Sequence, residues 1–152
     1  MINRARSCAV TGHRILEKGF NRAEVESKLI QLIKIGYNEF LVGMALGFDT
    51  VCFQILENLR KQNSIKIIAC IPCKTQADKF SKKDREEYER MILSADEKVY
   101  ISEEYTPTCM QRRNKFMVDN ASVVLSYLRK EKTGTANTVN YAKRQQVIII
   151  NV

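Results

Sequence analysis

Short apolar runs alternate with helical periods along the whole chain, and this alternation is the feature that most constrains the fold. The apolar runs lie near residues 8–10, 40–42, 66–71, 98–101, 123–128 and 147–151. The helical periods lie between them, near residues 22–35, 48–60, 82–93, 107–118 and 134–145. Strands that alternate with helices favour a mostly parallel sheet covered by helices. We therefore predict a single Rossmann-like, doubly wound α/β domain that spans residues 1–152.

Capping residues mark several of the predicted helix boundaries. Asn21 is followed three residues later by Glu24, which is the spacing of a capping box. Thr106 before Pro107 predicts an N-cap followed by proline at the first helical position. Gly36 is placed to end the first helix in the left-handed conformation. These signals fix the predicted helix ends independently of the hydrophobic periods.

The composition is that of an ordinary globular protein with an excess of positive charge. The hydrophobic content of 45% is sufficient for a core, and the net charge of +8 favours anionic partners. The aromatic residues are not interleaved with the basic clusters, as they are on many base-stacking surfaces. No apolar run approaches the roughly 20 residues of a membrane span, and no apolar segment typical of a signal peptide follows residues 1–7. We expect a cytoplasmic protein without a membrane partner.

The five cysteines do not form the pattern of a disulfide framework, because their number is odd and most lie in apolar runs. Cys70 and Cys73 have the spacing of a redox dithiol or of half a zinc site. The chain has no second close pair of cysteines, and His13 is its only histidine. We predict that the pair lies in the core or at a strand end, with a redox role as the alternative, and we expect no metal site.

A candidate anion site lies where the apolar run 123–128 passes through a short basic loop into a helix. Gly134 and Thr135 stand at the N-terminus of that helix. A helix N-terminus in this position presents free amide N–H groups and the positive end of the helix dipole, to which Thr135 adds a hydroxyl. This arrangement predicts a site for a phosphate-bearing ligand.

The first apolar run ends in a glycine turn that carries polar side chains. Gly12 is followed by His13 and Arg14. His13 is a candidate acid/base or ligand-orienting group, with a merely solvated side chain as the alternative. Arg14 is placed either to reach a phosphate or to lie exposed in the loop.

The second apolar run ends in a loop in which Gly43 and Gly47 flank an apolar triplet. Glycines at this spacing let the backbone approach a ligand closely. Asp49 follows in the first helical turn, where it either stabilises the helix dipole or contacts a ribose or takes part in catalysis. Because ligands of open parallel sheets bind beyond the carboxyl ends of the strands, we expect these loops to share one site.

Arg113 is the most informative single position. On a helix it lies on the same stripe as Cys109 and Met117, which are four residues before and after it. An unpaired buried charge is costly, so this arginine must form an internal ion pair or reach an anion. Asn114 is placed to bond the same ligand or to cap a neighbouring loop.

Five segments together carry a family resemblance. They are Thr11-Gly12-His13-Arg14, Gly43-Met44-Ala45-Leu46-Gly47-Phe48-Asp49, Ile71-Pro72-Cys73 with Gln76, Met110-Gln111-Arg112-Arg113-Asn114 and Gly134-Thr135-Ala136-Asn137-Thr138-Val139. The chain resembles the YpsA-like branch of the SLOG superfamily nearly end to end. Relatives of that branch include the LOG-type phosphoribohydrolases and the Rossmann-like core of the DNA-processing protein DprA. The resemblance implies a Rossmann-like fold and a nucleotide-related ligand.

The resemblance to the LOG enzymes stops at a catalytic position. Those enzymes release a nucleobase from a nucleoside monophosphate, with an arginine in a Met-x-x-Arg segment and a glutamate in a Gly-Thr-x-x-Glu segment. Arg113 matches the arginine, whereas Thr138 stands at the glutamate position. A threonine cannot act as a carboxylate base. The Pro-Gly-Gly of the LOG enzymes is also replaced, by Lys132-Thr133-Gly134.

We therefore expect the chain to bind a nucleotide or nucleotide-derived small molecule, as a sensor or carrier, and to use no other cofactor. Gly134, Thr135 and Arg113 are expected to hold the phosphate. The loop that contains Gly43, Gly47 and Asp49 is expected to lie against the ribose or base.

Two other functions remain as alternatives. One is hydrolysis of an N-glycosidic bond, as in the LOG enzymes, with Asp49 or His13 in place of the glutamate. The other is binding of single-stranded nucleic acid, as in DprA, which the charge of +8 would favour. Helical faces of such folds often self-associate, so a homo-oligomer is compatible with the sequence.

Overall fold

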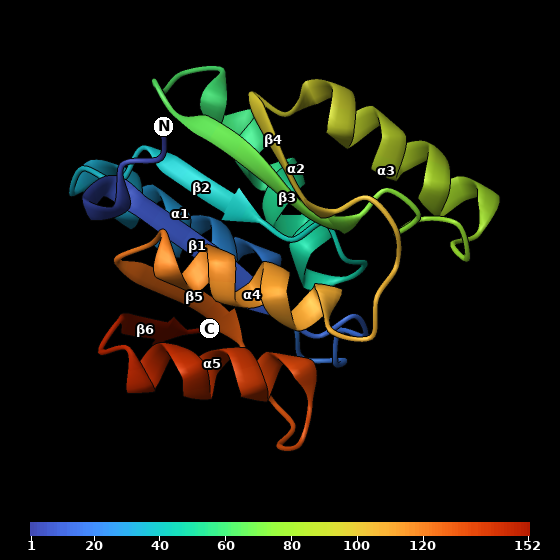
Figure 1. Ribbon diagram of the computed structural model, residues 1–152. Helices are drawn as coiled ribbons and strands as arrows, with labels where there is room; N and C mark the ends of the chain where they lie inside the picture. Colours follow the sequence, from blue (N-terminus) through green and yellow to red (C-terminus); the bar gives the residue numbers. More distant parts are fainter.

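A computed structural model describes residues 1–152, which form six strands and five α-helices in alternation (Figure 1). The strands are β1 (Ser7–Gly12), β2 (Glu39–Val42), β3 (Lys66–Cys73), β4 (Glu97–Ser102), β5 (Val123–Tyr127) and β6 (Ile148–Asn151). The helices are α1 (Arg22–Lys34), α2 (Phe48–Arg60), α3 (Lys82–Ser94), α4 (Cys109–Asp119) and α5 (Gly134–Arg144), and a 3-10 helix η1 (Arg4–Arg6) precedes β1. None of these helices is both long and apolar enough to cross a membrane.

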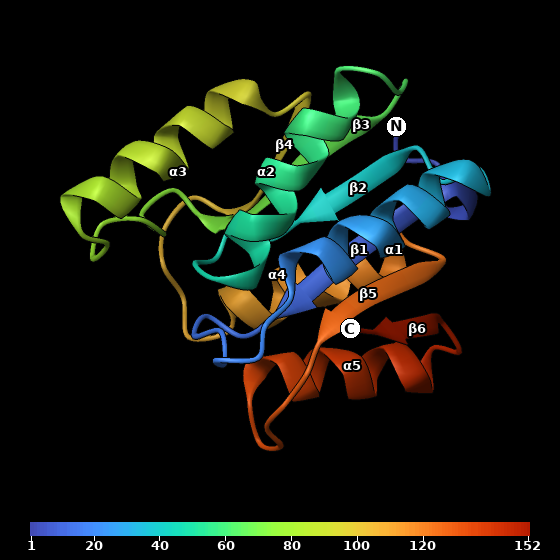
Figure 2. The ribbon, with the colours of Figure 1, turned by 180° about the vertical axis from the view of Figure 1, so that it is seen from behind.

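The six strands form one sheet in the order β4-β3-β2-β1-β5-β6, and every neighbouring pair is parallel. The chain builds the sheet outward from β1 to β4 and then returns through α4 to place β5 on the other side of β1. Helices α1, α2 and α3 cover one face of the sheet, and α4 and α5 cover the other (Figures 1 and 2). The predicted doubly wound α/β fold is confirmed.

The core lies in two layers because strand residues alternate between the faces of the sheet. In β1, Cys8 and Val10 belong to the larger apolar cluster, with residues of α1, α2 and α3. Ala9 between them belongs to the smaller cluster, with residues of α4 and α5. All three are almost fully buried, as expected for a strand covered on both faces.

Two of the three predicted helix boundaries are confirmed and one is wrong. The Asn21 side chain accepts hydrogen bonds from the amides of the first turn of α1, and Gly36 follows that helix with a φ of 115°. Helix α4, however, begins at Cys109, and its N-cap Thr108 makes no side-chain capping bond. The Cys109 amide donates to the Thr106 carbonyl at 3.2 Å, so Pro107 occupies the second position of a turn before the helix.

The Cys70 and Cys73 thiols lie inside the sheet, as the core interpretation predicts. Both belong to β3, both are buried, and all five cysteines of the chain are free. Residues three apart on a strand point to opposite faces, so these two side chains diverge. Burial also raises the pKa of the Cys70 thiol to about 12, which disfavours the reactive thiolate.

Candidate functional site

The carboxyl ends of β1 and β2 meet the N-terminus of α5 and the inner face of α4 around a cavity of about 300 Å³. This cavity lies at the point where the sheet order reverses between β1 and β5, which is where open α/β sheets bind ligands. Of the predicted site residues, the structure brings together Gly12, His13, Arg14, Gly43, Asp49, Arg113, Asn114, Gly134 and Thr135. Only Gly47 does not line this cavity, which we call the switch-point cavity.

The N-terminus of α5 offers unpaired amides to the switch-point cavity. Thr133 is the N-cap, and its Oγ1 accepts a hydrogen bond from the Ala136 amide at 3.1 Å. The Asn137 amide donates to the Thr133 carbonyl, whereas the amides of Gly134 and Thr135 find no acceptor in the chain. Thr135 is buried and Gly134 is exposed at the cavity wall. Two free donors and the helix dipole therefore face the same space.

Arg113 reaches the cavity from the buried side of α4, as the helical spacing predicts, and is only 6% exposed. Its Nη1 donates to the Gly43 carbonyl, and its Nε donates to Asn114 Oδ1 at 2.7 Å. It forms no ion pair, and its Nη2 makes no hydrogen bond to the protein. Burial lowers the pKa of the guanidinium, because the charged form loses its hydration. A ligand anion would restore that lost stabilisation.

Gly43 is a glycine because the Arg113 side chain lies against it. A Cβ atom at this position would be 2.9 Å from the Arg113 Cζ, which is closer than real side chains allow. The Gly43 carbonyl also accepts a hydrogen bond from Gln76 Nε2 at 3.1 Å, and the Tyr88 hydroxyl donates to Gln76 Oε1 at 2.9 Å. Gln76 and Tyr88 thus position the acceptor that holds Arg113. The sequence alone does not connect them, because the contact joins β2, α3 and the loop after β3.

Asp49 places a buried carboxyl group in the wall of the cavity. Its Oδ2 accepts a hydrogen bond from the Ala45 amide at 3.1 Å, whereas its Oδ1 is buried without any partner. Burial raises the pKa of Asp49 to about 6, although Arg113 and Arg14 act in the opposite direction. An orphaned buried oxygen of this kind is costly unless a ligand supplies a hydrogen bond.

Gly47 serves the backbone rather than the cavity wall. It has a φ of 81°, and a Cβ atom there would lie 2.1 Å from the Arg14 carbonyl oxygen. The next residue, Phe48, donates its amide to the His13 carbonyl at 3.1 Å. Gly47 therefore lets the start of α2 pack against the loop after β1. Its predicted contact with a ligand stays a prediction.

His13 is held in place by hydrogen bonds and is not merely solvated, and its acid/base role stays a prediction. Its Nε2 accepts hydrogen bonds from the amides of Arg129 at 2.8 Å and Lys130 at 3.2 Å. Partial burial and the nearby charge of Lys130 lower the pKa of the imidazole. His13 therefore ties the loop after β1 to the loop after β5. Arg14 beside it is exposed, and its Nη2 lies 4.0 Å from the Met110 sulfur at the cavity mouth.

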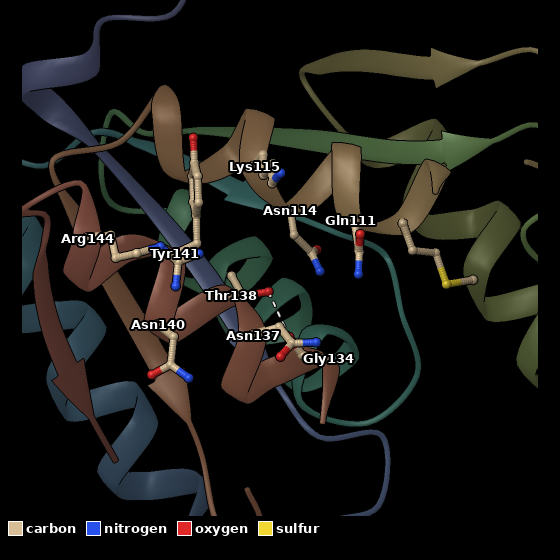
Figure 3. A pocket seen from close by; sticks show the side chains of 10 residues that line it. Gln111, Asn114, Lys115, Gly134, Asn137, Thr138, Asn140, Tyr141 and Arg144 are labelled. Carbon is tan, nitrogen blue, oxygen red and sulfur yellow. Dashed lines mark hydrogen bonds between the residues drawn. The ribbon is translucent and has the colours of Figure 1, made fainter. Parts of the chain in front are cut away.

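A second hollow, of about 410 Å³, lies between α4 and α5 (Figure 3). We call it the α4–α5 groove; Gln111, Asn114, Lys115, Asn137, Thr138 and Arg144 are among the residues that line it. Thr138 Oγ1 donates to the Gly134 carbonyl at 2.9 Å, so the residue at the LOG glutamate position is used within its own helix. This groove was not predicted from the sequence. The available signal was the repeat of amide side chains at helical spacing on both helices.

The parallel sheet, the reversal beside β1 and the cavity at that reversal define a Rossmann-like α/β protein. A family model described as the YspA SLOG family, named YpsA, matches residues 8–148, and the chain belongs to this family. The SPbeta prophage-derived protein YoqJ of Bacillus subtilis is 33% identical in an alignment of 120 positions that covers 69% of this chain and 69% of that protein. A UPF0398 protein of Bacillus licheniformis is 24% identical over 152 residues, covering 91% of this chain and 83% of that protein.

Two solved structures of DprA show the same fold. DprA of Streptococcus pneumoniae superposes with a TM-score of 0.68 at 22% identity, covering 95% of this chain and 49% of that one. DprA of Helicobacter pylori superposes with a TM-score of 0.72 at 16% identity, covering 99% of this chain and 65% of that one. At these identities the likeness concerns the fold, and the chain spans only part of either DprA structure.

Proposed function

We propose that the protein binds a nucleotide or nucleotide-derived small molecule in the switch-point cavity, as a sensor or carrier. The observation that carries this proposal is the convergence of two unlike anion-binding groups on one space. Arg113 is buried without an ion pair, and the free amides of Gly134 and Thr135 line the same cavity. A phosphate would accept hydrogen bonds from both, and charge-assisted bonds of this kind are the stronger ones.

The unpartnered oxygen of Asp49 supports the proposal that the ligand carries a sugar next to that phosphate. This Oδ1 is buried at the cavity and needs a hydrogen-bond partner. A ribose hydroxyl can donate to a carboxylate and can accept from a carboxylic acid, so it would satisfy Asp49 on either side of its pKa of about 6. Phosphate and hydroxyl groups on one small molecule are the combination that a nucleotide presents.

The test is a thermal-shift and calorimetry panel of nucleoside mono- and diphosphates, with Arg113→Ala and Arg112→Ala as a matched pair. The two arginines are adjacent on α4, but Arg112 is exposed and Arg113 is buried. Losing a charge-assisted hydrogen bond weakens binding by about tenfold or more, so Arg113→Ala should lose affinity and Arg112→Ala should not. Arg113→Lys keeps the charge without the bidentate geometry and should give an intermediate affinity. No binding by any nucleotide, or equal binding by both alanine variants, would refute the proposal.

Binding of single-stranded DNA is a second candidate. The solved Helicobacter pylori DprA structure, which shares this fold, concerns a single-stranded DNA binding mode of that protein. In this chain Arg129 and Lys130 lie in the loop held by His13, beside the cavity, and the net charge is +8. This candidate predicts DNA affinity that falls steeply between low and moderate salt, because phosphate contacts release counterions. Fluorescence anisotropy with an oligothymidylate measures it, and the absence of salt-dependent binding would remove it.

The hydrolase alternative depends on Asp49, which is the only carboxylate that lines the switch-point cavity. A pKa of about 6 suits a group that both gives and takes a proton near neutral pH. Chromatography of nucleoside monophosphates after incubation with the protein tests it directly. Free base with ribose 5-phosphate, lost in Asp49→Asn, would favour an enzyme, and unchanged substrate would favour the sensor or carrier.

A further inference from the structure

The α4–α5 groove is continuous with the switch-point cavity. Met110, Asn114 and Gly134 line both spaces. Gly134 stands at the free N-terminus of α5, where we place the phosphate, and the groove runs from there along the helix. A molecule held by its phosphate at Gly134 therefore has an open path between the two helices.

Amide side chains crowd the start of this groove. Figure 3 shows Gln111 and Asn114 of α4 pointing toward Asn137 of α5 across the gap. The side chains of Gln111 and Asn137 are exposed and make no hydrogen bond within the chain. Asn114 is fixed, because its Oδ1 accepts from Arg113 Nε at 2.7 Å, which leaves both hydrogens of its Nδ2 free. Three amides with open hydrogen-bonding capacity thus face one space.

The aromatic ring in the groove is already engaged. Lys115 Nζ lies 5.6 Å from the Tyr141 ring centroid, and the Arg144 guanidinium lies 5.8 Å from it. The Tyr141 hydroxyl donates to Asp119 Oδ1 at 2.7 Å. Since cations already contact this ring, the groove offers hydrogen bonds at its start more readily than a stacking platform.

We propose that the start of the α4–α5 groove is a nucleobase site, in which Gln111, Asn114 and Asn137 hydrogen-bond the edge of a base. This inference rests on the proposed function, because it places the base of the ligand whose phosphate binds in the switch-point cavity. An amide presents a donor beside an acceptor, which matches the N6 and N7 edge of adenine. The site therefore fits a nucleotide whose base carries a donor beside an acceptor, as adenine does.

The spacing along α5 suits one nucleotide. Gly134 and Asn137 are three residues apart, which is about 4.5 Å along the helix axis. A base linked to the phosphate through a single sugar can cover that distance. Asn114 then has two roles, because its Oδ1 orients Arg113 for the phosphate while its Nδ2 is free for the base. This position would couple recognition of the two ends of the ligand.

The experiment compares AMP with ribose 5-phosphate by calorimetry, because the two share the sugar and the phosphate and differ at C1', where ribose 5-phosphate has a hydroxyl in place of the base. The wild type should bind AMP at least tenfold more tightly than ribose 5-phosphate. Gln111→Ala and Asn137→Ala should each reduce that ratio by about fivefold, and their affinity for ribose 5-phosphate should stay unchanged. Asn58→Ala, an exposed asparagine of α2 on the other face of the sheet, is the matched control and should keep the wild-type ratio.

The outcomes separate this inference from the proposed function. If AMP and ribose 5-phosphate bind equally, or the amide variants keep the full ratio while Arg113→Ala still weakens both ligands, the base site is refuted and the phosphate site stands. If AMP and ribose 5-phosphate do not bind but another nucleotide of the panel does, the base site is refuted and the proposed function stands; if no nucleotide binds, both proposals fall.

Discussion

Asp49 holds a carboxyl group where burial works against its charge. Because its pKa is raised from 3.8 to about 6, the folded protein binds a proton more tightly than the unfolded chain does. The stabilisation from the protonated group is complete below pH 4 and is lost as the pH rises through 6. A shift of this size corresponds to a cost of about 3 kcal/mol at neutral pH if nothing else compensates.

Asp49→Asn should therefore stabilise the free protein at pH 7.5, by up to about 3 kcal/mol, and should weaken nucleotide binding. The gain should shrink toward zero near pH 4, where the native carboxyl is protonated as well. Thermal unfolding at the two pH values measures this difference, and Asp78→Asn, which changes an exposed carboxylate, is the control. A variant that is less stable than the wild type at pH 7.5 would contradict the assignment.

His13 makes the contact between the loop after β1 and the loop after β5 pH-dependent. Its neutral Nε2 accepts from the amides of Arg129 and Lys130, and protonation of that nitrogen abolishes the acceptor. Because the pKa of His13 is lowered in the folded state, this contribution to stability is present near neutral pH and is lost as the pH falls through that pKa. We expect the Arg129 and Lys130 amide resonances to shift with a midpoint below about 6.5, the usual value for histidine. Titration by NMR measures the midpoint, and the transition should be absent in His13→Ala.

At the scale of elements, the N-terminus of α5 depends on one side chain. Thr133 Oγ1 is the acceptor for the Ala136 amide. Thr133→Ala should cost about 1 kcal/mol in unfolding free energy, as the loss of an N-cap does. The same change loosens the turn that aims the Gly134 and Thr135 amides, so phosphate affinity should fall too. Thr133→Ser retains the cap and should restore both quantities in chemical denaturation and calorimetry; a Ser variant as weak as the Ala variant would exclude capping as the cause.

The elements themselves follow from the sequence to within two residues at most boundaries, because the hydrophobic period changes there and several helix ends carry caps or a glycine. Arg113 could be placed on the buried face from its spacing to Cys109 and Met117 alone. The start of α4 could not be predicted in the same way, because Pro107 is compatible both with a turn and with the first position of a helix. The hydrogen-bond partners of Arg113 could not be predicted from the sequence either. Its acceptor is the backbone carbonyl of Gly43, just after β2, and no local pattern reveals a contact that spans 70 positions.

The α4–α5 groove shows the same limit at a larger scale. Amides at positions 111, 114 and 137 stand at helical spacing in the sequence, but they meet only because α4 and α5 lie side by side. That contact arises from the reversal of the sheet at β1, which brings β5 and its following helix next to the helix before it. A sequence pattern within one helix does not specify how two helices are aligned with each other.

At the scale of the whole molecule, the labelling rate of the buried thiols measures how often the fold opens. The five cysteines lie in β1, α2, β3 and α4, and all are buried. Burial also raises the pKa of the Cys8 thiol to about 12, so a thiol reagent should react only after opening. Under native conditions all five should be labelled slowly, with one rate that follows the unfolding free energy.

Helix α4 provides the strictest test of a single labelling rate. Cys109 is its first residue, and its N-cap lacks a side-chain hydrogen bond, so fraying of this turn would label Cys109 ahead of the others. Mass spectrometry of the time course distinguishes the two cases. A nucleotide that bridges Arg113 and α5 should slow the labelling of Cys109 and should leave an Arg113→Ala variant unprotected. Equal protection in that variant would mean that the ligand stabilises the molecule from somewhere other than the switch-point cavity.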